Sequence, residues 1–521
     1  MMTRAMRLPL YAALVLSLAM PLGAGAQEQA GQREQPAQGQ QQETRRSRPE
    51  GREQQPLPPE SVTRHSLQLP GRSLSFTATA GHLTLTDQQG APQAEIGFVA
   101  YTRDDADPAT RPVTFAVNGG PGASSAYLHL LAIGPWLLPM DGPTISPSAP
   151  TTLVPNAETW LDFTDLVFID PPGTGYSRVV GGDQVRERFY SVQGDIDGLA
   201  AATMRWLKEK NRLTSPKFFV GESYGGFRGP LLAQKLQNDQ GIGFSGLVLV
   251  SPVFDFDWLD QGTGAPWTNA ALLPSLAAAK LSREGPVTRE RLQEAETYAS
   301  GEYLVDLMRG LQDKQAVERL GQRVADLSGL DPALTRRLAG RIDMRTVQRE
   351  LRRGSSEVVS AYDTNVAIPD PNPNSQSSRF EDPVLDAMTA PLTSAIIQHM
   401  TQNLNYKAEG RYNLLNGSIN GAWRWGNGRN GPENLEELRQ ALSLDGNLRV
   451  LVTHGFTDLV TPYYASQLLL NQLPDLGPQK RVALSVYEGG HMFYSRQASR
   501  QAFKADVQRL FEEALQARAA D

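Results

Sequence analysis

Hydrophobic residues along this chain follow two patterns, and each predicts a different kind of strand. From residue 65 to residue 101, short segments alternate apolar and polar side chains between turns rich in Gly, Pro and Asp, which is typical of an antiparallel meander. Beyond this region, apolar residues form unbroken runs at 113–117, 165–169, 217–221 and 246–250. Continuous apolar runs indicate strands that are covered on both faces, as in a parallel α/β sheet.

Helix-like patterns separate these runs and then interrupt the sheet. The stretch from Ser191 to Lys210 opens with a capping Ser and predicts a covering helix. Between residues 255 and 380 the strand signal disappears, and charged amphipathic stretches replace it. Residues 369–379 are rich in Pro, Asn and Ser, which predicts a loop. We therefore expect residues 255–380 to form an inserted helical cap.

Sheet character returns near the C-terminus, at 448–455 and 480–490, and a closing helix is expected from about Gln497. The 521 residues exceed what one compact core of roughly 250 to 300 residues needs. The predicted fold is an α/β core made of residues 61–254 and 381–521. It has a mostly parallel central sheet, an N-terminal antiparallel meander and the inserted cap.

The first 26 residues have the composition of a secretory signal peptide. Two arginines precede an apolar run that ends in small residues. Pro9 and Pro21 interrupt this run, which falls short of the roughly 20 apolar residues that a membrane span requires. We therefore favour cleavage over a transmembrane anchor, with no membrane span after cleavage. The protein is predicted to be exported, either periplasmic or secreted.

The composition of the chain indicates a disordered segment and argues against nucleic acid as a partner. Residues 27–60 are rich in Gln, Glu, Arg and Pro and poor in large apolar side chains, so we expect a disordered tether. The net charge of −6 gives no basic face for nucleic acid. The chain contains no Cys, so its stability must come from the core, although an exported compartment permits disulfides.

A serine stands where a strand turns into a helix. Ser223 lies between Gly221 and Gly225, directly after the apolar run 217–221. A sharp turn from strand to helix strains the residue at its apex and requires small residues on both sides. Ser223 is therefore the candidate nucleophile. A serine hydroxyl also needs a base, and the base needs an orienting acid.

His491 and Asp458 are the candidate base and acid. His491 follows the last predicted strand, and Asp458 lies five residues beyond Thr453, near the end of the strand before it. The chain order Ser, acid, His is that of α/β-hydrolases. Asp458 alone also fits a capping role ahead of Thr461. His454 is the competing base but precedes the acid in the same loop, and the remaining four histidines fit structural or solvated roles better.

Acyl transfer also needs hydrogen-bond donors for the developing oxyanion. The first buried strand runs into a Gly-rich turn at 118–122, whose exposed amides can face a ligand. The expected donors are the amides of Gly120 and of Tyr224, the residue after the nucleophile. The stretch 171–177 resembles a phosphate loop but lacks its Lys-Ser/Thr pair, so we expect no nucleotide site. No metal or other cofactor is expected.

Four sequence blocks together resemble the serine carboxypeptidase family, whose members have the α/β-hydrolase fold. The blocks are NGGPGASS (118–125), IDPPGTGYS (169–177), GESYGG (221–226) and the loops of Asp458 and His491. The resemblance implies removal of single residues from peptides that have a free C-terminus, with an acidic pH preference. It also implies that Asn118, Gly119 and Glu222 bind the terminal carboxylate, which requires a protonated Glu222.

The chain departs from the better-known members of that family at three positions. Ala116 and Ala123 replace a Trp and a Cys, and Ala132 replaces a second Glu that shares a proton with the first. Loss of the second Glu weakens the family account of carboxylate binding and of the acidic preference. Arg228 is an alternative carboxylate ligand, or else an arginine that packs its stem and exposes its head.

Three functions are therefore compared. The leading one is a serine carboxypeptidase that forms an acyl-enzyme on Ser223, with the cap setting side-chain preference. An esterase or acyltransferase would use the same triad, because chemistry and substrate are separable within one fold. A non-catalytic binding protein is the remote alternative, because nothing in the triad indicates decay.

Overall fold

The structure is a computed structural model that describes residues 56–140, 145–259, 265–375, 380, 382–426 and 431–520. The predicted signal peptide (1–26) lies outside the described residues, as does most of the predicted tether. Glu60, at the end of that tether, accepts hydrogen bonds from Lys210 Nζ at 2.7 Å. The first described strand begins at Ser61.

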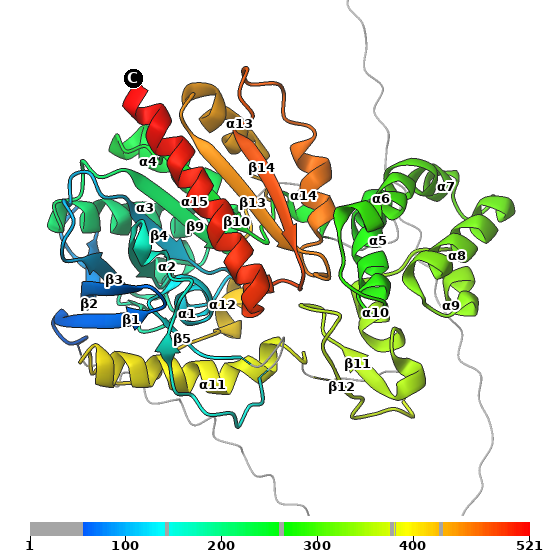
Figure 1. The fold of residues 1–521 in the computed structure, drawn as a ribbon, viewed down its shortest axis with the longest axis horizontal. Coiled ribbons are helices and arrows are strands. Elements are labelled where there is room, and N and C mark those ends of the chain that lie inside the picture. The colour runs from blue at the N-terminus through cyan, green and yellow to red at the C-terminus, as the bar shows by residue number, and fades with distance from the viewer. Residues whose placement is uncertain are drawn as a thin grey trace, which may run out of the picture. The chain divides into compact units, whose positions relative to one another are not determined.

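A central sheet of ten strands organises the described part of the chain (Figure 1). Its strands are β1 (Ser61–Leu69), β2 (Arg72–Thr86), β3 (Pro92–Arg103), β4 (Val113–Val117), β7 (Asp165–Ile169), β8 (Arg178–Val179), β9 (Lys217–Glu222), β10 (Gly246–Val250), β13 (Arg449–Gly455) and β14 (Val482–Tyr487). Their order is β1-β2-β3-β7-β4-β9-β10-β13-β14, with β8 beside β3. Pairing is antiparallel from β1 to β7 and parallel from β7 to β14.

This topology confirms the predicted mostly parallel sheet and its N-terminal meander. The four unbroken apolar runs are β4, β7, β9 and β10, which lie side by side and are buried along their whole length. The reason is that helices cover both faces of this half of the sheet. The carboxyl ends of its parallel strands meet at one edge, where the loops that follow them carry the candidate site.

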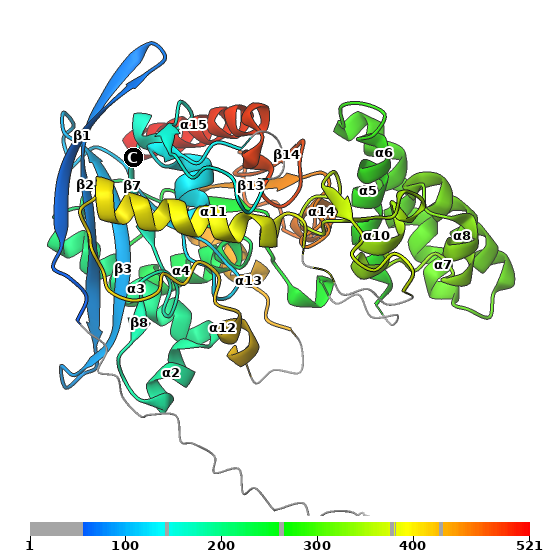
Figure 2. The ribbon, with the colours of Figure 1, turned by 90° about the horizontal axis from the view of Figure 1, so that it is seen from below.

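Two helical layers cover the sheet (Figure 2). The helices of the core are α1 (Ala126–Leu128), α2 (Asp183–Phe189), α3 (Val192–Glu209), α4 (Tyr224–Gln240), α11 (Leu385–Gln398), α12 (Gly417–Ala422), α13 (Leu435–Leu444), α14 (Tyr463–Leu470) and α15 (Gln497–Ala520). On one face, Phe511 of α15 stacks on Phe218 of β9, with ring centroids 3.7 Å apart. On the other face, α3, α4 and α13 pack around Phe219 of β9. As predicted, Ser191 caps α3 by accepting from Gly194 N.

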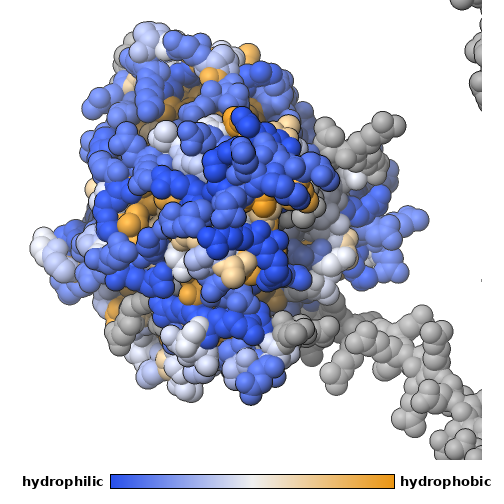
Figure 3. Space-filling view, turned by 90° about the vertical axis from the view of Figure 1, so that its right-hand side faces the viewer, coloured by the Kyte–Doolittle hydropathy of each residue, from blue (hydrophilic) through white to orange (hydrophobic). Residues whose placement is uncertain are grey.

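The region predicted as a cap contains six helices in its described part. They are α5 (Pro266–Leu281), α6 (Arg289–Tyr298), α7 (Leu304–Arg309), α8 (Lys314–Ser328), α9 (Pro332–Arg337) and α10 (Met344–Glu350). Two strands, β11 (Glu357–Val359) and β12 (Ala367–Pro369), pair antiparallel there. At three residues each, they are too short to produce a readable strand pattern. The face of the molecule on this side is mainly hydrophilic, with apolar residues scattered over it (Figure 3).

Two further short strands pair outside the central sheet, namely β5 (Trp136–Leu137) and β6 (Val154–Pro155). They lie in the connection between β4 and β7, downstream of the Gly-rich turn. No helix among the described residues is long and apolar enough to cross a membrane.

Candidate active site

Ser223 occupies the junction between β9 and α4 in a strained backbone conformation. Its φ of 60° and ψ of −124° lie outside the regions that side chains prefer, as expected for a nucleophile at the apex of such a turn. A Cβ atom at Gly221 would overlap the carbonyl of Gly225, and a Cβ at Gly225 would overlap the carbonyl of Val117. Both positions therefore require glycine, for the reason that the sequence pattern suggested.

His491 and Asp458 form a buried pair at the carboxyl edge of the sheet. Asp458 follows β13 and His491 follows β14, and His491 Nδ1 lies 2.7 Å from Asp458 Oδ2. Asp458 also accepts hydrogen bonds from the amides of Val460 and Thr461, so it orders its own turn as well as facing the imidazole. Since Nδ1 faces the carboxylate, Nε2 is the ring nitrogen left for proton exchange.

The pKa of His491 is raised by its partner Asp458. Burial disfavours the charged imidazolium, but the charge of Asp458, its hydrogen bond and the charge of Glu222 outweigh burial and raise the pKa of His491 above its ordinary value. Such a base accepts a proton readily once it is neutral. The arrangement suits general base catalysis near neutral pH.

Two adjacent residues at the end of β10 hold the serine turn and the histidine loop together. The amide of Ser223 donates to the carbonyl of Val250 at 2.8 Å. The hydroxyl of Ser251 donates to the carbonyl of His491 at 2.8 Å. The end of β10 thus joins the segments of Ser223 and His491, although the two residues are 268 positions apart in the sequence.

The Gly-rich turn lies against the start of α4. A Cβ atom at Gly119 would come within 2.5 Å of the amide nitrogen of Tyr224, so the turn touches the residue after the nucleophile. Gly120 has a φ of 103°, which favours glycine, and it is exposed. Gly120 and Tyr224, the two predicted oxyanion donors, therefore lie on the two segments that meet here.

Arg228 is neither an arginine with an exposed head group nor free to bind a substrate carboxylate, the two roles considered from the sequence. It is fully buried, where its Nε donates to Asp195 Oδ2 at 2.6 Å and its Nη1 donates to the carbonyl of Asn118 at 2.5 Å. Its guanidinium also lies 4.6 Å from the ring centroid of Tyr224. Arg228 is therefore a bracing residue beneath the Gly-rich turn. The sequence could not reveal this, because its partner Asp195 lies 33 positions upstream on another helix.

Glu222 lies beside the nucleophile and is almost completely buried. Its Oε2 accepts from Asn118 Nδ2 at 2.5 Å and from Tyr494 OH at 2.7 Å. Burial raises the pKa of Glu222, against the opposing effects of His491 and of these two donors. A carboxyl group that protonates above the ordinary glutamate range is what carboxylate binding would require. Asn118, Gly119 and Glu222 are predicted from the sequence to act together, but Tyr494 is not.

The position of the absent second Glu is apolar. Ala132 is buried in the hydrophobic core, in a short π-helical turn (His129–Ile133) that follows α1. Its carbonyl accepts from Asn156 Nδ2 at 2.9 Å. The shared-proton pair of the better-known family members therefore has no counterpart at this position.

Asp170, which directly precedes the phosphate-loop-like stretch, bonds to the segment that follows the Gly-rich turn. Asp170 Oδ1 accepts from the amide of Ser125 at 2.8 Å, and Tyr412 OH lies 3.3 Å from Asp170 Oδ2. Burial raises the pKa of Asp170 to about 6, although both hydrogen bonds oppose the shift. Among the described residues, no group of three or more His, Cys, Asp or Glu side chains could hold a metal ion.

A segment between β11 and β12 contacts the loops of both Asp458 and His491. The amide of His491 donates to the carbonyl of Tyr362 at 2.6 Å. Asp363 accepts from Thr457 Oγ1 at 2.8 Å and pairs with Arg496 at 2.6 Å. Thr457 precedes the acid in the chain and Arg496 follows the base. The region predicted as a cap therefore also helps to hold the Asp458 and His491 loops in place.

The competing histidine has a different environment. His454 is buried in β13, and its Nε2 lies 2.8 Å from Ser466 Oγ on α14. Burial lowers the pKa of His454 to about 4. His129 and His399 are also buried, each with its Nε2 within 2.7 Å of Tyr101 OH. These contacts fit the structural roles that the sequence analysis preferred for them.

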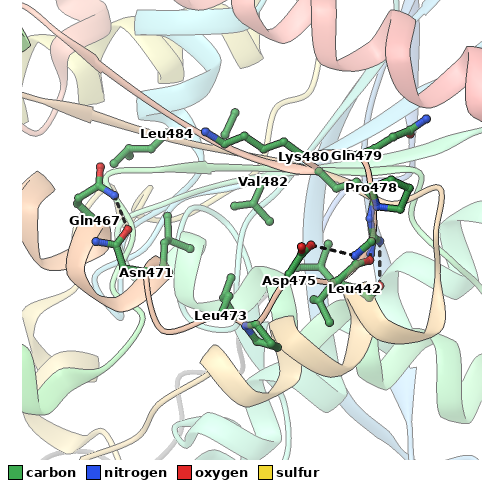
Figure 4. Close-up of a pocket in the computed structure, with 16 residues that line it drawn as sticks. Leu442, Gln467, Asn471, Leu473, Asp475, Pro478, Gln479, Lys480, Val482 and Leu484 are labelled. Atoms are coloured by element: carbon green, nitrogen blue, oxygen red, sulfur yellow. Dashed lines mark hydrogen bonds between the residues drawn. The ribbon is translucent and has the colours of Figure 1, made fainter.

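A separate pocket of about 490 Å³ opens beside the edge strand β14, away from these residues (Figure 4). It is lined by the end of α13, by α14, by the following loop and by β14. Gln467 Nε2 donates to Asn471 Oδ1 at 2.8 Å within this lining. Ser223, Asp458 and His491 do not line it, so it plays no part in the candidate site.

Comparison with known proteins points to one family. A family model described as "Serine carboxypeptidase" matches residues 70–505. Serine carboxypeptidase-like 13 of Arabidopsis thaliana is 25% identical over 207 residues, which cover 39% of this chain and 45% of that protein. Pheromone-processing carboxypeptidase KEX1 of Saccharomyces cerevisiae is 30% identical over 170 residues, which cover 30% of this chain and 22% of that protein. The matched stretches span less than half of these relatives.

A solved structure resembles nearly the whole described chain. The crystal structure of KEX1(delta)p, a prohormone-processing carboxypeptidase from Saccharomyces cerevisiae, matches with a TM-score of 0.55 and 16% sequence identity. The match covers 84% of this chain and 92% of that chain. At this level of identity the likeness concerns the fold, which is the α/β-hydrolase fold.

Proposed function

Since this chain belongs to the serine carboxypeptidase family, we propose that it is an exported serine hydrolase that releases single residues from the C-terminus of peptides. The observation that carries the proposal is the buried His491–Asp458 pair together with a strained Ser223, whose segments both bond to residues at the end of β10. In the proposed reaction, Ser223 Oγ attacks the last peptide carbonyl while His491 Nε2 takes its proton. Asp458 keeps the imidazole in the required tautomer.

The later steps use the same residues. The amides of Gly120 and Tyr224 donate to the oxyanion of the tetrahedral intermediate. When the C–N bond breaks, His491 gives its proton to the leaving amine, and the free amino acid departs. Water, deprotonated by His491, then attacks the acyl-enzyme and releases the shortened peptide from Ser223.

Specificity for a free C-terminus is assigned to Asn118, Gly119 and Glu222. The Glu222 carboxyl can donate to a substrate carboxylate only when protonated, because two carboxylates repel each other. Its burial and raised pKa support this role. The absence of a second carboxyl at Ala132 is the feature that keeps an esterase or acyltransferase as the alternative. A non-catalytic binding protein is the remote alternative.

The cellular placement and domain roles complete the proposal. Residues 1–26 act as a signal peptide whose removal delivers the enzyme to the periplasm or the exterior. Residues 27–60 form a tether, and residues 255–380 form a cap that sets side-chain preference. The partner is a peptide with a free C-terminus. Support for these assignments comes from the sequence patterns and, for the cap, from the helices α5 to α10.

A covalent probe tests the nucleophile. A fluorophosphonate should label the wild type and Ser223→Ala should abolish labelling, whereas Ser443→Ala, at an exposed serine on α13, should leave it unchanged. Equal labelling of all three proteins would reject Ser223 as the nucleophile.

A matched pair of peptides tests the exopeptidase claim. Between pH 5 and pH 7 the free-acid peptide should be shortened, and the same peptide with an amidated C-terminus should react far more slowly. Hydrolysis of a simple ester without shortening of the free-acid peptide would favour the esterase alternative.

A further inference from the structure

Tyr494 is a buried residue at the candidate site that has no role in the sequence-based predictions or in the proposed mechanism. It lies in a short 3-10 turn (Phe493–Ser495), three positions beyond His491, and its side chain is fully buried. Its hydroxyl donates to Glu222 Oε2 at 2.7 Å. Asn118 Nδ2 donates to the same oxygen, so the two donors fix one side of the carboxyl group.

The other groups around Glu222 come from several elements. Those that influence it or are influenced by it electrostatically are His491, Asp458, Asn118, Tyr494, Tyr127 and Tyr362. The charge of His491 and the two hydrogen bonds favour the ionised carboxylate, whereas burial and the charge of Asp458 disfavour it. In the folded protein, burial raises the pKa of Tyr494 well above 10, so its hydroxyl remains a donor throughout the acidic and neutral range.

A phenol differs from the second carboxyl group of the better-known family members, which Ala132 replaces in this chain. A second carboxyl can share or lose its proton as pH changes, whereas a phenol donates at every pH relevant here. A permanent donor stabilises the charged form of its acceptor carboxyl. Its presence therefore lowers the pH at which Glu222 loses the proton that it needs to bind a substrate carboxylate.

We infer that Tyr494 is a positioning residue for Glu222, and that its hydroxyl sets the upper pH limit at which the enzyme binds a free substrate carboxylate. This inference rests on the proposed function, because it concerns the same carboxylate-binding group. Tyr494 acts through Glu222 and has no assigned contact with the substrate.

Removing the hydroxyl should extend binding to higher pH. In Tyr494→Phe the carboxyl loses one donor, and a hydrogen bond to a charged group corresponds to a shift of roughly one pH unit. The rise in KM with pH for a free-acid peptide should therefore move upward by about one unit. The pH profile for an ester without a free carboxylate should stay in place. A downward shift, no shift, or equal shifts for both substrates would overturn the inference.

Two further variants make the test specific. Tyr127→Phe removes another buried hydroxyl near Glu222, one that has no hydrogen-bond partner among the described residues, and it should leave both profiles unchanged. Glu222→Gln carries no titrating group at this position and should abolish the rise in KM with pH. If Tyr127→Phe shifts the peptide profile as much as Tyr494→Phe does, loss of packing rather than the hydrogen bond is responsible.

A spectroscopic readout separates this inference from the proposed function. In Ser223→Ala protein labelled with ¹³C-glutamate, the Glu222 carboxyl signal, assigned by its loss in Glu222→Gln, should titrate about one unit higher when Tyr494 is Phe. If the wild type fails to shorten peptides while this shift is observed, the proposed function fails and the positioning role of Tyr494 stands. If peptides are shortened but the signal does not move, the inference is wrong.

Discussion

The guanidinium of Arg228 donates a hydrogen bond from Nη1 to the carbonyl of Asn118 at 2.5 Å, so α4 holds the first residue of the Gly-rich turn in place. The same guanidinium is paired with Asp195 of α3, and both side chains are about 1% exposed. α3 and α4, which cover one face of the sheet, thus fix the turn that carries a proposed oxyanion donor. A buried ion pair of this kind can fix the position of nearby groups without adding to the folding stability of the protein.

Changes to this pair should separate stability from activity. Asp195→Asn leaves a buried, unpaired guanidinium and should cost about 3–5 kcal/mol of unfolding free energy. The double variant Asp195→Leu with Arg228→Met removes both charges and should recover most of that loss. It should still lower kcat for an ester about tenfold or more, because the carbonyl of Asn118 loses its donor. Denaturant unfolding and ester kinetics measure the two effects. Full activity in the double variant would show that the brace has no catalytic consequence.

The two titrating groups of the site predict different pH profiles for two substrates. An ester without a free carboxylate requires only neutral His491. Burial opposes the imidazolium, but Asp458 and Glu222 outweigh it, so the pKa of His491 lies above 6.5 and the ester rate should rise through a midpoint above that pH. A free-acid peptide also requires protonated Glu222, so its KM should increase as pH rises.

The peptide optimum should therefore lie at lower pH than the ester plateau. The measurement is kcat and KM for both substrates between pH 4 and pH 9. Identical profiles for the two substrates would contradict the assigned role of Glu222.

The segment between β11 and β12 should matter for catalysis as well as for folding. Asp363→Ala removes the contacts to Thr457 and Arg496, which flank the acid and the base. We expect kcat to fall about tenfold, with a much smaller change in KM, because the acid and base loops become less well positioned. Asp313→Ala is the matched control, since Asp313 caps α8 within the same region and its loss should cost about 1 kcal/mol of stability. A similar fall in kcat in both variants would point to general loosening of the cap.

The sequence was sufficient for the parts of the fold that repeat a simple pattern. β4, β7, β9 and β10 could be predicted from their unbroken apolar runs, because every residue in these strands is buried. The location of Ser223, Asp458 and His491 at one edge of the sheet could also be predicted. Each follows a predicted strand, and the carboxyl ends of parallel strands meet at one edge. Local chemistry also predicts the glycines beside Ser223, since backbone atoms occupy the space that a Cβ would need.

Long-range contacts between side chains could not be predicted in this way. Tyr494 and Glu222 are 272 residues apart, and nothing in the local pattern around Tyr494 differs from an ordinary buried aromatic residue. Arg228 looked like a surface arginine or a ligand because its partner lies on a different helix. The contact of Tyr362 and Asp363 with the catalytic loops depends on how the inserted region folds back, which hydrophobic periodicity does not encode.

Asp170 should make stability depend on pH. Burial raises its pKa from 3.8 to about 6 in the folded state, so the folded protein binds this proton more tightly than the unfolded chain does. The stabilisation is therefore fully present below about pH 4 and is lost as pH rises through 6. The difference of about two pH units corresponds to roughly 3 kcal/mol.

Asp170→Asn removes this titration. Urea unfolding at pH 4.5 and pH 7 should show a smaller loss of stability with rising pH in the variant than in the wild type. The comparison between the two proteins cancels the contribution of other titrating groups. Equal losses in both would mean that Asp170 is not held in the protonated form by burial.

Stepwise loss of mass from a peptide tests the central claim most directly. A peptide with a free C-terminus is incubated at several pH values between pH 5 and pH 8 with the wild type or with Ser223→Ala, and intact masses are followed over time. The wild type should produce a ladder in which single residues disappear from the C-terminal end, and Ser223→Ala should produce none. An intact peptide with the wild type, internal cleavage, or an unchanged ladder with Ser223→Ala would contradict a serine carboxypeptidase acting through Ser223.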